Sequence, residues 1–216
     1  MKLLFVVHAF PPHHRAGVEN YAAQIAQGLA ETHQVVVATT RKVISLPTGM
    51  IRRDSLDGVP VFEVINNLDH DGFPGTFANA TMERAFAAIV DEVRPDIVHF
   101  QHLMYWSLNL PAMARSFGVP CLMTLHDFHL ACPRMGQMLD WEGRLCEAPS
   151  PARANPCQVR TWWAQDEGQR RWIRRLSAVR RATGLALDAP LRAADRIRRK
   201  LAPTGSSTGQ ARPPTD

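Results

Sequence analysis

The chain has 216 residues, of which 45% are hydrophobic and 21% charged, values close to the average for a globular protein with a buried core. They exclude a disordered or collagen-like chain, and no apolar run reaches the roughly 18 residues that a membrane-spanning helix needs. The formal net charge of +5 is unevenly spread, because residues 1–150 hold 11 Lys and Arg against 15 Asp and Glu, whereas residues 151–200 hold 13 against 4.

Strand and helix patterns alternate along the first part of the chain. Residues 2–7 (KLLFVV) are a continuous apolar run, typical of a strand buried on both faces. Apolar residues then recur at helical spacing from Val18 to Leu29. Further strands are predicted at 34–40, 59–65, 96–102 and 119–127, with helices over 82–93 and in a short stretch that ends at Gly118. This alternation predicts an α/β fold, with a Rossmann-like, doubly wound, mainly parallel sheet and helices on both faces.

The remainder of the chain has a different character. A long loop is expected over 128–157, and basic amphipathic helices over 161–202 follow a first domain at 1–160. The composition of residues 203–216 predicts a disordered tail. The arginines of the helices suit either peripheral contact with anionic lipids or a solvated surface, and both interpretations stay open. Nucleic acid is not expected as a partner, because no recognition motif accompanies the charge.

The first turn between strand and helix runs from His8 to Gly17. It contains neither G-x-G-x-x-G nor G-x-x-x-x-G-K-[ST], which disfavours a nicotinamide enzyme and a P-loop ATPase. Gly17 stands where the predicted helix begins, so its missing Cβ would let an anionic group approach the free N–H groups of the first turn. A glycine that only permits the turn explains the residue equally well.

Several segments together resemble the N-terminal domain of the family-four-like, retaining glycosyltransferases of the GT-B fold. The segments are HAFPPHHRAGVENYAAQIAQGLAETHQVVVATT, RPDIVHFQH, VPCLMTLHDFHLACPR and GRLC. The resemblance implies transfer of a sugar from a nucleotide-diphosphate donor to a glycan or lipid-linked acceptor, in a cleft between two Rossmann-like domains. It also implies that Gly17 faces the donor diphosphate or the acceptor, and that His126 is the catalytic residue beside the transferred sugar. The nucleotide sugar is a co-substrate, and no cofactor is expected.

Other candidate residues follow from their positions in the predicted sheet. His126 and Asp127 are expected to end a strand at its carboxyl edge, where doubly wound sheets bind ligands; a histidine that only caps the strand is the alternative for His126. His102 is expected at the end of the preceding strand, with Tyr105 just beyond it. We expect His126 and Gly17 to border one pocket. The first turn adds His13, Arg15 and Glu19 as donor- or acceptor-binding candidates. If the imidazoles are protonated, His13, His14 and Arg15 form a cationic cluster suited to a phosphorylated or carboxylated acceptor. The alternative is that these exposed loop residues are simply solvated.

A metal site is a weaker prediction. Cys132, Cys146 and Cys157, with His129 beside the first, could supply four zinc ligands. Because the spacings are wide and include no C-x-x-C pair, buried or free thiols are preferred, and no bound metal is expected.

The resemblance covers about residues 1–160 and extends to no second Rossmann-like domain. We therefore expect the acceptor-side half of an enzyme, as a truncated product or as one chain of a split enzyme with a partner that supplies the C-terminal domain. A non-catalytic Rossmann-like binding module is the alternative. The four cysteines are too few for a disulfide scaffold, and the N-terminal run reads as a strand rather than a signal peptide, so a cytoplasmic location is expected, with cell-envelope polysaccharide synthesis as one setting.

Overall fold

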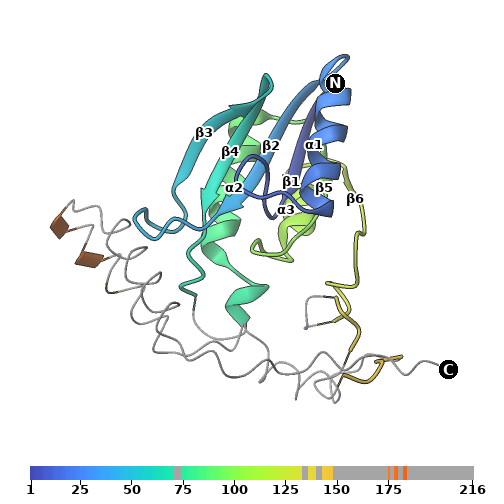
Figure 1. The fold of residues 1–216 in the computed structure, drawn as a ribbon. Coiled ribbons are helices and arrows are strands. Elements are labelled where there is room, and N and C mark those ends of the chain that lie inside the picture. Colours follow the sequence, from blue (N-terminus) through green and yellow to red (C-terminus); the bar gives the residue numbers. More distant parts are fainter. Residues whose placement is uncertain are drawn as a thin grey trace.

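A computed structural model describes residues 1–70, 74–132, 136–139 and 143–147, together with 175, 178, 179, 182 and 183. A single six-stranded sheet organises the well-described part, in the order β3-β4-β2-β1-β5-β6 (Figure 1). The strands are β1 (Lys2–Val7), β2 (Gln34–Arg41), β3 (Ile51–Leu56), β4 (Val59–Ile65), β5 (Ile97–Phe100) and β6 (Cys121–Met123). The helices are α1 (Gly17–Ala30), α2 (Ala80–Val93) and α3 (Leu110–Ser116), with a 3-10 turn at Pro74–Thr76.

The sheet is parallel except at one edge. β1 pairs in parallel with β2 and β5, β2 with β4, and β5 with β6, whereas β3 is antiparallel to β4. β3 was not expected, because four of its six residues (Arg52, Arg53, Asp54 and Ser55) are polar and exposed. Asp57 and Gly58 connect β3 to β4, both with positive φ, as a tight hairpin turn requires. The predicted mainly parallel α/β fold is confirmed.

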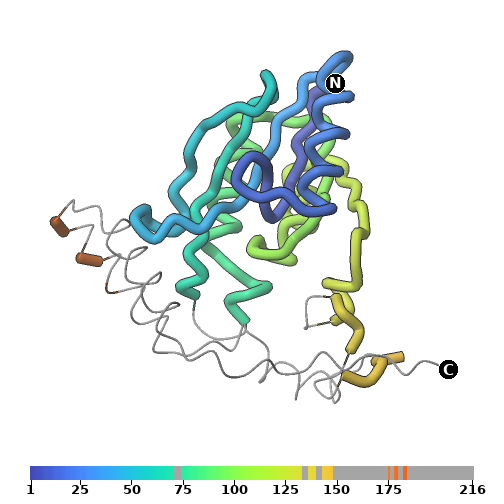
Figure 2. The backbone as a smooth tube through the Cα atoms, viewed as in Figure 1, coloured from blue at the N-terminus to red at the C-terminus, as the bar shows by residue number. Residues whose placement is uncertain are grey.

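Helices cover both faces of the sheet, as the backbone tube in Figure 2 also shows. On one face α1 packs its alanines onto Phe5, Val7 and Val37. On the other face α2 and α3 enclose a larger core, in which Phe86, Phe100 and Trp106 are buried. The predicted helix that ends before Pro95 is α2, which closes at Arg94 with a left-handed residue. Burial of both faces explains why the central strands are almost continuously apolar.

Two strands end earlier than the sequence predicts. β5 stops at Phe100 and β6 at Met123, so His102, His126 and Asp127 lie in the loops beyond the strands rather than at their last positions. The backbone N–H of Thr124 still donates to the carbonyl of Phe100, at 2.9 Å. The chain therefore continues beside β5 after the regular ladder has stopped, and the loop keeps the direction of the strand.

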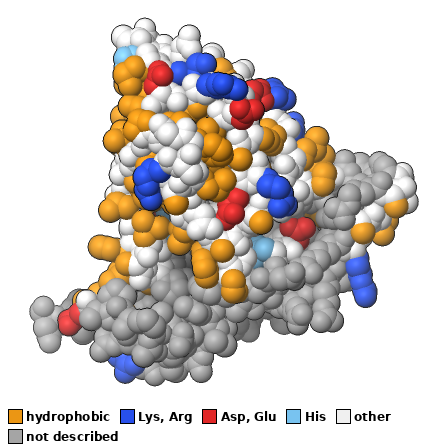
Figure 3. Space-filling model, turned by 180° about the vertical axis from the view of Figure 1, so that it is seen from behind, with side chains coloured by type: hydrophobic (Ala, Val, Ile, Leu, Met, Phe, Trp, Pro, Cys, Tyr) orange, Lys and Arg blue, Asp and Glu red, His pale blue; other side chains and the backbone are white. Residues whose placement is uncertain are grey.

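The C-terminal predictions fall largely outside the described residues. Within the helices expected over 161–202, the structure describes Arg175, Ala178, Val179, Ala182 and Thr183, which are helical and exposed. The expected tail at 203–216 lies outside the described residues. Among the described residues, no helix has the length and apolarity that a membrane span requires. Figure 3 shows the face opposite that of Figure 1, where hydrophobic side chains are interspersed with side chains of both charges.

Candidate active site at the carboxyl edge of the sheet

Polar side chains from four elements converge where β1, β5 and β6 end. His8 follows β1 directly, and Glu19 comes from the first turn of α1. Gln101 and His102 follow β5, while His126 and Asp127 lie beyond β6. Parallel strands bring their carboxyl ends to the same edge, so residues that are more than 100 positions apart in the sequence meet there.

His8 and Glu19 form a buried pair on the α1 side of this edge. Nε2 of His8 lies 3.2 Å from Oε1 of Glu19, and the two residues are only 7% and 4% exposed. Burial, reinforced by the neighbouring rings of His102, His129 and His14, lowers the pKa of His8 to about 3. The ring is therefore neutral near pH 7, with its Nε2 facing the glutamate. Nδ1 of His8 and Oε2 of Glu19 are buried without a hydrogen-bond partner among the described residues.

His102 holds Asp127 in a fixed arrangement. The backbone N–H of Met104 donates to Nδ1 of His102 at 3.0 Å, so the ring proton is on Nε2, which donates to Oδ2 of Asp127 at 3.1 Å. The backbone N–H of His129 donates to the other carboxylate oxygen. Burial would raise the pKa of Asp127, but the hydrogen bonds from the His129 backbone and the His102 ring, with the nearness of these two histidines, hold it below its ordinary value. Asp127 is thus an ionised acceptor at neutral pH.

His126 belongs to a second chain of hydrogen bonds. Its Nε2 lies 3.1 Å from Oε1 of Gln101, whose amide nitrogen lies 3.1 Å from Nε2 of His99. The same His99 nitrogen is 2.8 Å from the hydroxyl of Thr124. Burial, with the nearby His102, lowers the pKa of His126, against an opposing contribution from Asp127, so the ring is neutral near pH 7. A neutral imidazole at this edge can accept a hydrogen bond from a hydroxyl group.

The beginning of α1 reaches the same part of the edge. The ring of Tyr21, one turn after Gly17, meets the ring of His126 edge-on, with centroids 5.1 Å apart. Gly17 is exposed, and a Cβ there would have no heavy atom within 4 Å. The pocket at this edge is lined by residues of 101–103 and 123–130, among them His102, His126 and Asp127; Gly17 is not one of its lining residues.

Tyr105 lies beside the ring of His8. Its backbone is left-handed, with φ of 66°, and its carbonyl accepts from the side-chain amide of Asn66 at 2.6 Å. The Tyr105 and His8 rings are 6.1 Å apart. Burial and the charge of Glu19 raise the pKa of the phenol, so Tyr105 keeps its proton. Left-handed non-glycine residues concentrate at functional sites, where the surrounding structure holds them in place.

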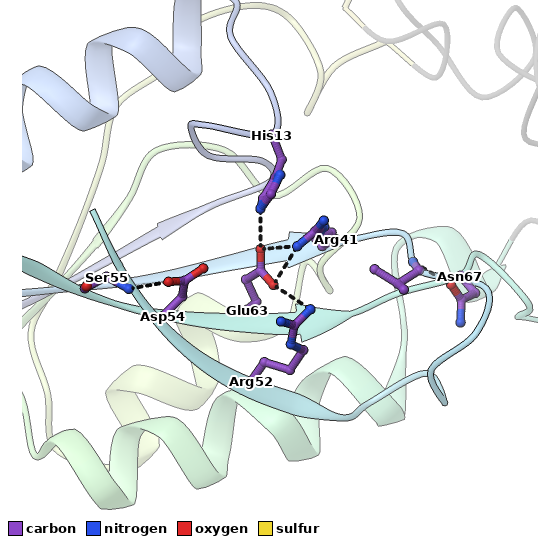
Figure 4. Close-up of polar contacts among 8 residues, drawn as sticks. His13, Arg41, Arg52, Asp54, Ser55, Glu63 and Asn67 are labelled. Atoms are coloured by element: carbon purple, nitrogen blue, oxygen red, sulfur yellow. Dashed lines mark hydrogen bonds and ion pairs between the residues drawn. The ribbon is translucent and has the colours of Figure 1, made fainter. Parts of the chain in front are cut away.

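The first-turn cations divide into two groups. His13 points at Glu63, a buried residue of β4, with Nε2 3.7 Å from Oε1 (Figure 4). Arg41 contacts both oxygens of that carboxylate, and Arg52 approaches at 3.6 Å. Arg15 and His14 are exposed. The predicted cationic cluster of His13, His14 and Arg15 stays a prediction. The structure adds a mixed-charge cluster around Glu63, which sequence reasoning missed because its members come from three separate elements and the first loop.

Two groups of side chains contain possible metal ligands. His13, Asp54 and Glu63 bring ligand atoms within 4.8 Å of one another. Arginines 41 and 52 already occupy the Glu63 carboxylate, and their charge opposes a metal cation. His129, Cys132 and Cys146 do not form such a group among the described residues, and Cys157 lies outside them. The suggestion of zinc stays an untested prediction.

A larger hollow, of about 570 Å³, lies at the opposite edge of the sheet. Its lining includes Lys2, His33, Arg94 and Asp96, which stand at the amino ends of strands. The Asp96 carboxylate there accepts the backbone N–H of Lys2. Because ligands of doubly wound sheets bind at the carboxyl ends of the strands, we place the candidate site at the His102–His126 edge.

The fold and this edge define a Rossmann-like α/β domain with a histidine- and carboxylate-rich site. The model of the family Glycosyltransferase Family 4 matches residues 15–199, and the chain belongs to that family. The match leaves out β1 and His8. No curated protein matches the chain.

Among solved structures, the chain is similar to two larger proteins. A sucrose-phosphate synthase from Thermosynechococcus elongatus is 13% identical, with a TM-score of 0.40, over 80% of this chain and 39% of that one. An E. coli trehalose-6-phosphate structure bound with UDP-2-fluoro glucose is 15% identical, with a TM-score of 0.35, over 57% and 32%. The chain spans less than half the length of either.

Proposed function

We propose that the chain is the acceptor-side half of a retaining glycosyltransferase, which moves a sugar from a nucleotide-diphosphate donor to a hydroxyl of a glycan or lipid-linked acceptor. The membership of the glycosyltransferase family supports the general activity. In this proposal a second Rossmann-like domain binds most of the donor, and the carboxyl edge of the present sheet binds the acceptor and the transferred sugar.

The observation that carries the proposal is the set of hydrogen-bond acceptors at that edge. Asp127 is ionised and exposed, and its carboxylate lines the pocket together with His102 and His126. Hydroxyl groups of a sugar are donors that match such a set. The neutral ring of His126 lies beside it and can bind a hydroxyl of the transferred sugar or respond to charge that develops during transfer. Gly17, Arg15 and His13 remain candidates for contact with the phosphates of the donor or with an anionic acceptor.

The experiment is a transfer assay on the natural protein, with its partner domain where one exists. Radiolabelled UDP-, GDP- and ADP-sugars are incubated with glycan and lipid-linked acceptors, and labelled product and donor hydrolysis are both measured. His126→Ala is expected to lower turnover at least about tenfold while the circular dichroism spectrum is unchanged.

The matched control is His33→Ala, at the opposite edge of the sheet, which is expected to keep the activity. Equal turnover in the His126 variant would remove that residue from the site. Acceptor binding with neither transfer nor hydrolysis would instead favour the alternative of a non-catalytic binding module.

A further inference from the structure

The side-chain amide of Gln101 lies between the rings of two histidines, His99 and His126. It is fully buried at the end of β5, with an exposed fraction of 0%. Its backbone N–H donates to the carbonyl of Val6 at 2.7 Å, which fixes the residue against β1. Its amide nitrogen faces His99 and its amide oxygen faces His126. An amide is the side chain that offers a donor on one side and an acceptor on the other.

The direction of these hydrogen bonds follows from that asymmetry. The N–H of Gln101 donates to Nε2 of His99, which makes that nitrogen an acceptor. Because the nitrogen has one lone pair, the hydroxyl of Thr124, 2.8 Å away, competes with Gln101 for it. The carbonyl oxygen of Gln101 can only accept, so Nε2 of His126 must carry the proton. We infer that Gln101 is a positioning residue that fixes His126 as the Nε2–H tautomer, with Nδ1 left as the lone-pair nitrogen that meets a hydroxyl of the substrate.

The neighbouring pair, His102 and Asp127, is also held by a directed hydrogen bond. His102 is locked by the backbone of Met104 and donates through Nε2 to Asp127. Consecutive residues after β5, Gln101 and His102, therefore hold consecutive residues beyond β6, His126 and Asp127. Both bonds continue the pairing of the two strands past the last ladder bond, from Thr124 to Phe100. Beyond this point, side-chain hydrogen bonds take the place of backbone hydrogen bonds in joining the loop after β5 to the loop after β6.

The tautomer of His126 matters because the ring is neutral. Burial and the nearby His102 lower the pKa of His126 more than Asp127 raises it. A neutral imidazole has one donor and one acceptor, and which nitrogen carries the proton decides what the ring offers to a ligand. With the proton directed at Gln101, the ring offers an acceptor to the substrate. Such an acceptor fits the sugar hydroxyls of the proposed function. The role of the tautomer in binding rests on that proposed function, whereas the tautomer itself follows from the hydrogen bonds alone.

The test is nuclear magnetic resonance of the full chain with ¹⁵N in the histidine rings, at a pH above the ordinary histidine value of about 6.5. His126→Asn assigns the signals. In the wild type we expect a protonated Nε2 and an unprotonated Nδ1 for His126. Gln101→Leu, which has neither donor nor acceptor, should bring the two nitrogens toward an averaged shift. Protonation on Nδ1 in the wild type, or an unchanged pattern in a folded Gln101→Leu variant, would overturn the inference.

A second variant keeps the test decisive if Gln101→Leu does not fold. Gln101→Glu retains an oxygen opposite His126, so the Nε2–H tautomer should persist, and the added charge should raise the pKa of His126 by about one unit or more. A mixed tautomer or an unshifted pKa in this variant contradicts the inference.

Activity separates this inference from the proposed function. In the transfer assay, Gln101→Leu should lower kcat about tenfold or more with little change in KM for the donor, and Gln101→Glu should recover part of the loss. Ser107→Ala, which removes another buried, hydrogen-bonded side chain on the α2–α3 side, is the matched control and should leave kcat unchanged. If His126 carries its proton on Nε2 but His126→Ala remains active, His126 is not catalytic, although Gln101 still positions its ring. Loss of kcat to the same extent in Ser107→Ala would show that Gln101 acts only through stability.

Discussion

At the residue scale, burial of His8 couples the stability of the fold to pH. The ring is held neutral at the end of β1, and its pKa falls from 6.5 to about 3, mainly through burial. Between these two values the unfolded chain binds a proton at His8 that the native chain does not. The free energy of unfolding therefore decreases as the pH is lowered below about 6.5, by at most about 1.4 kcal/mol per pH unit for this one group.

We predict that His8→Gln flattens this pH dependence. Glutamine is polar, like the neutral ring, but takes up no proton. Urea denaturation at several pH values between neutral and mildly acidic measures the slope. The wild-type slope should exceed that of the variant, and Ser107→Ala should lose stability without a change in slope. Parallel slopes for the wild type and His8→Gln would show that His8 is not buried as a neutral ring.

The polar residues of the candidate site could be predicted only in part from the sequence. His102, His126 and Asp127 were found because they follow apolar runs that end at one edge of a parallel sheet. Gln101 was passed over, since alternation with His99 places it on a side of the strand but says nothing of its two hydrogen bonds. His8 was part of the recognised first turn, yet its burial depends on α1 and on the loop after β5, which no local pattern encodes.

At the element scale, the first turn of α1 raises the question of what Gly17 does. Nothing lies within 4 Å of a Cβ at this position, and its φ is not one that favours glycine. Neither packing nor backbone strain therefore requires glycine in the unliganded fold. The N-cap is Ala16, which has no side-chain hydrogen bond to the first N–H groups of the helix. These groups are available to a ligand, which fits the interpretation that the missing side chain serves binding.

We predict that Gly17→Ala keeps or raises stability, by up to about 1 kcal/mol, because alanine restricts the unfolded chain. In the transfer assay the same change should cost at least about tenfold, since a methyl group displaces the ligand from the helix. Gly28→Ala is the matched control: it lies in the same helix with equally open space, and it should alter stability alone. Full activity of Gly17→Ala would show that the missing side chain does not serve binding.

The same scale shows which elements the sequence could predict. Strands with long apolar runs, such as β1, and the amphipathic α2 were found within a residue or two. β3 was missed because it is an edge strand with an exposed polar middle, stabilised by its pairing with β4. The strand predicted at 119–127 is only three residues long in the structure, because beyond Met123 the backbone pairing with β5 is reduced to the bond from Thr124 to Phe100.

At the scale of the whole molecule, two cores on opposite faces of the sheet hold the strand ends in place. His8, Glu19 and α1 belong to one side, and Trp106 anchors the loop after β5 from the other by donating to the carbonyl of Val7 at 2.9 Å. The site therefore depends on packing from both layers. The order of the elements predicted this architecture from the sequence, whereas the side-chain network at the edge depends on contacts between distant segments that no local pattern encodes.

The central claim is that sugars bind at the carboxyl edge of the sheet, between α1 and the loops after β5 and β6. The most direct measurement follows the histidine ring signals of the ¹⁵N-labelled chain while glucose, mannose, inositol and UDP-glucose are added one at a time. The account predicts that at least one of these ligands shifts the signals of His126, His102 and His8 together, and leaves His33 in place. Shifts confined to His33, beside the larger hollow at the opposite edge, would contradict it.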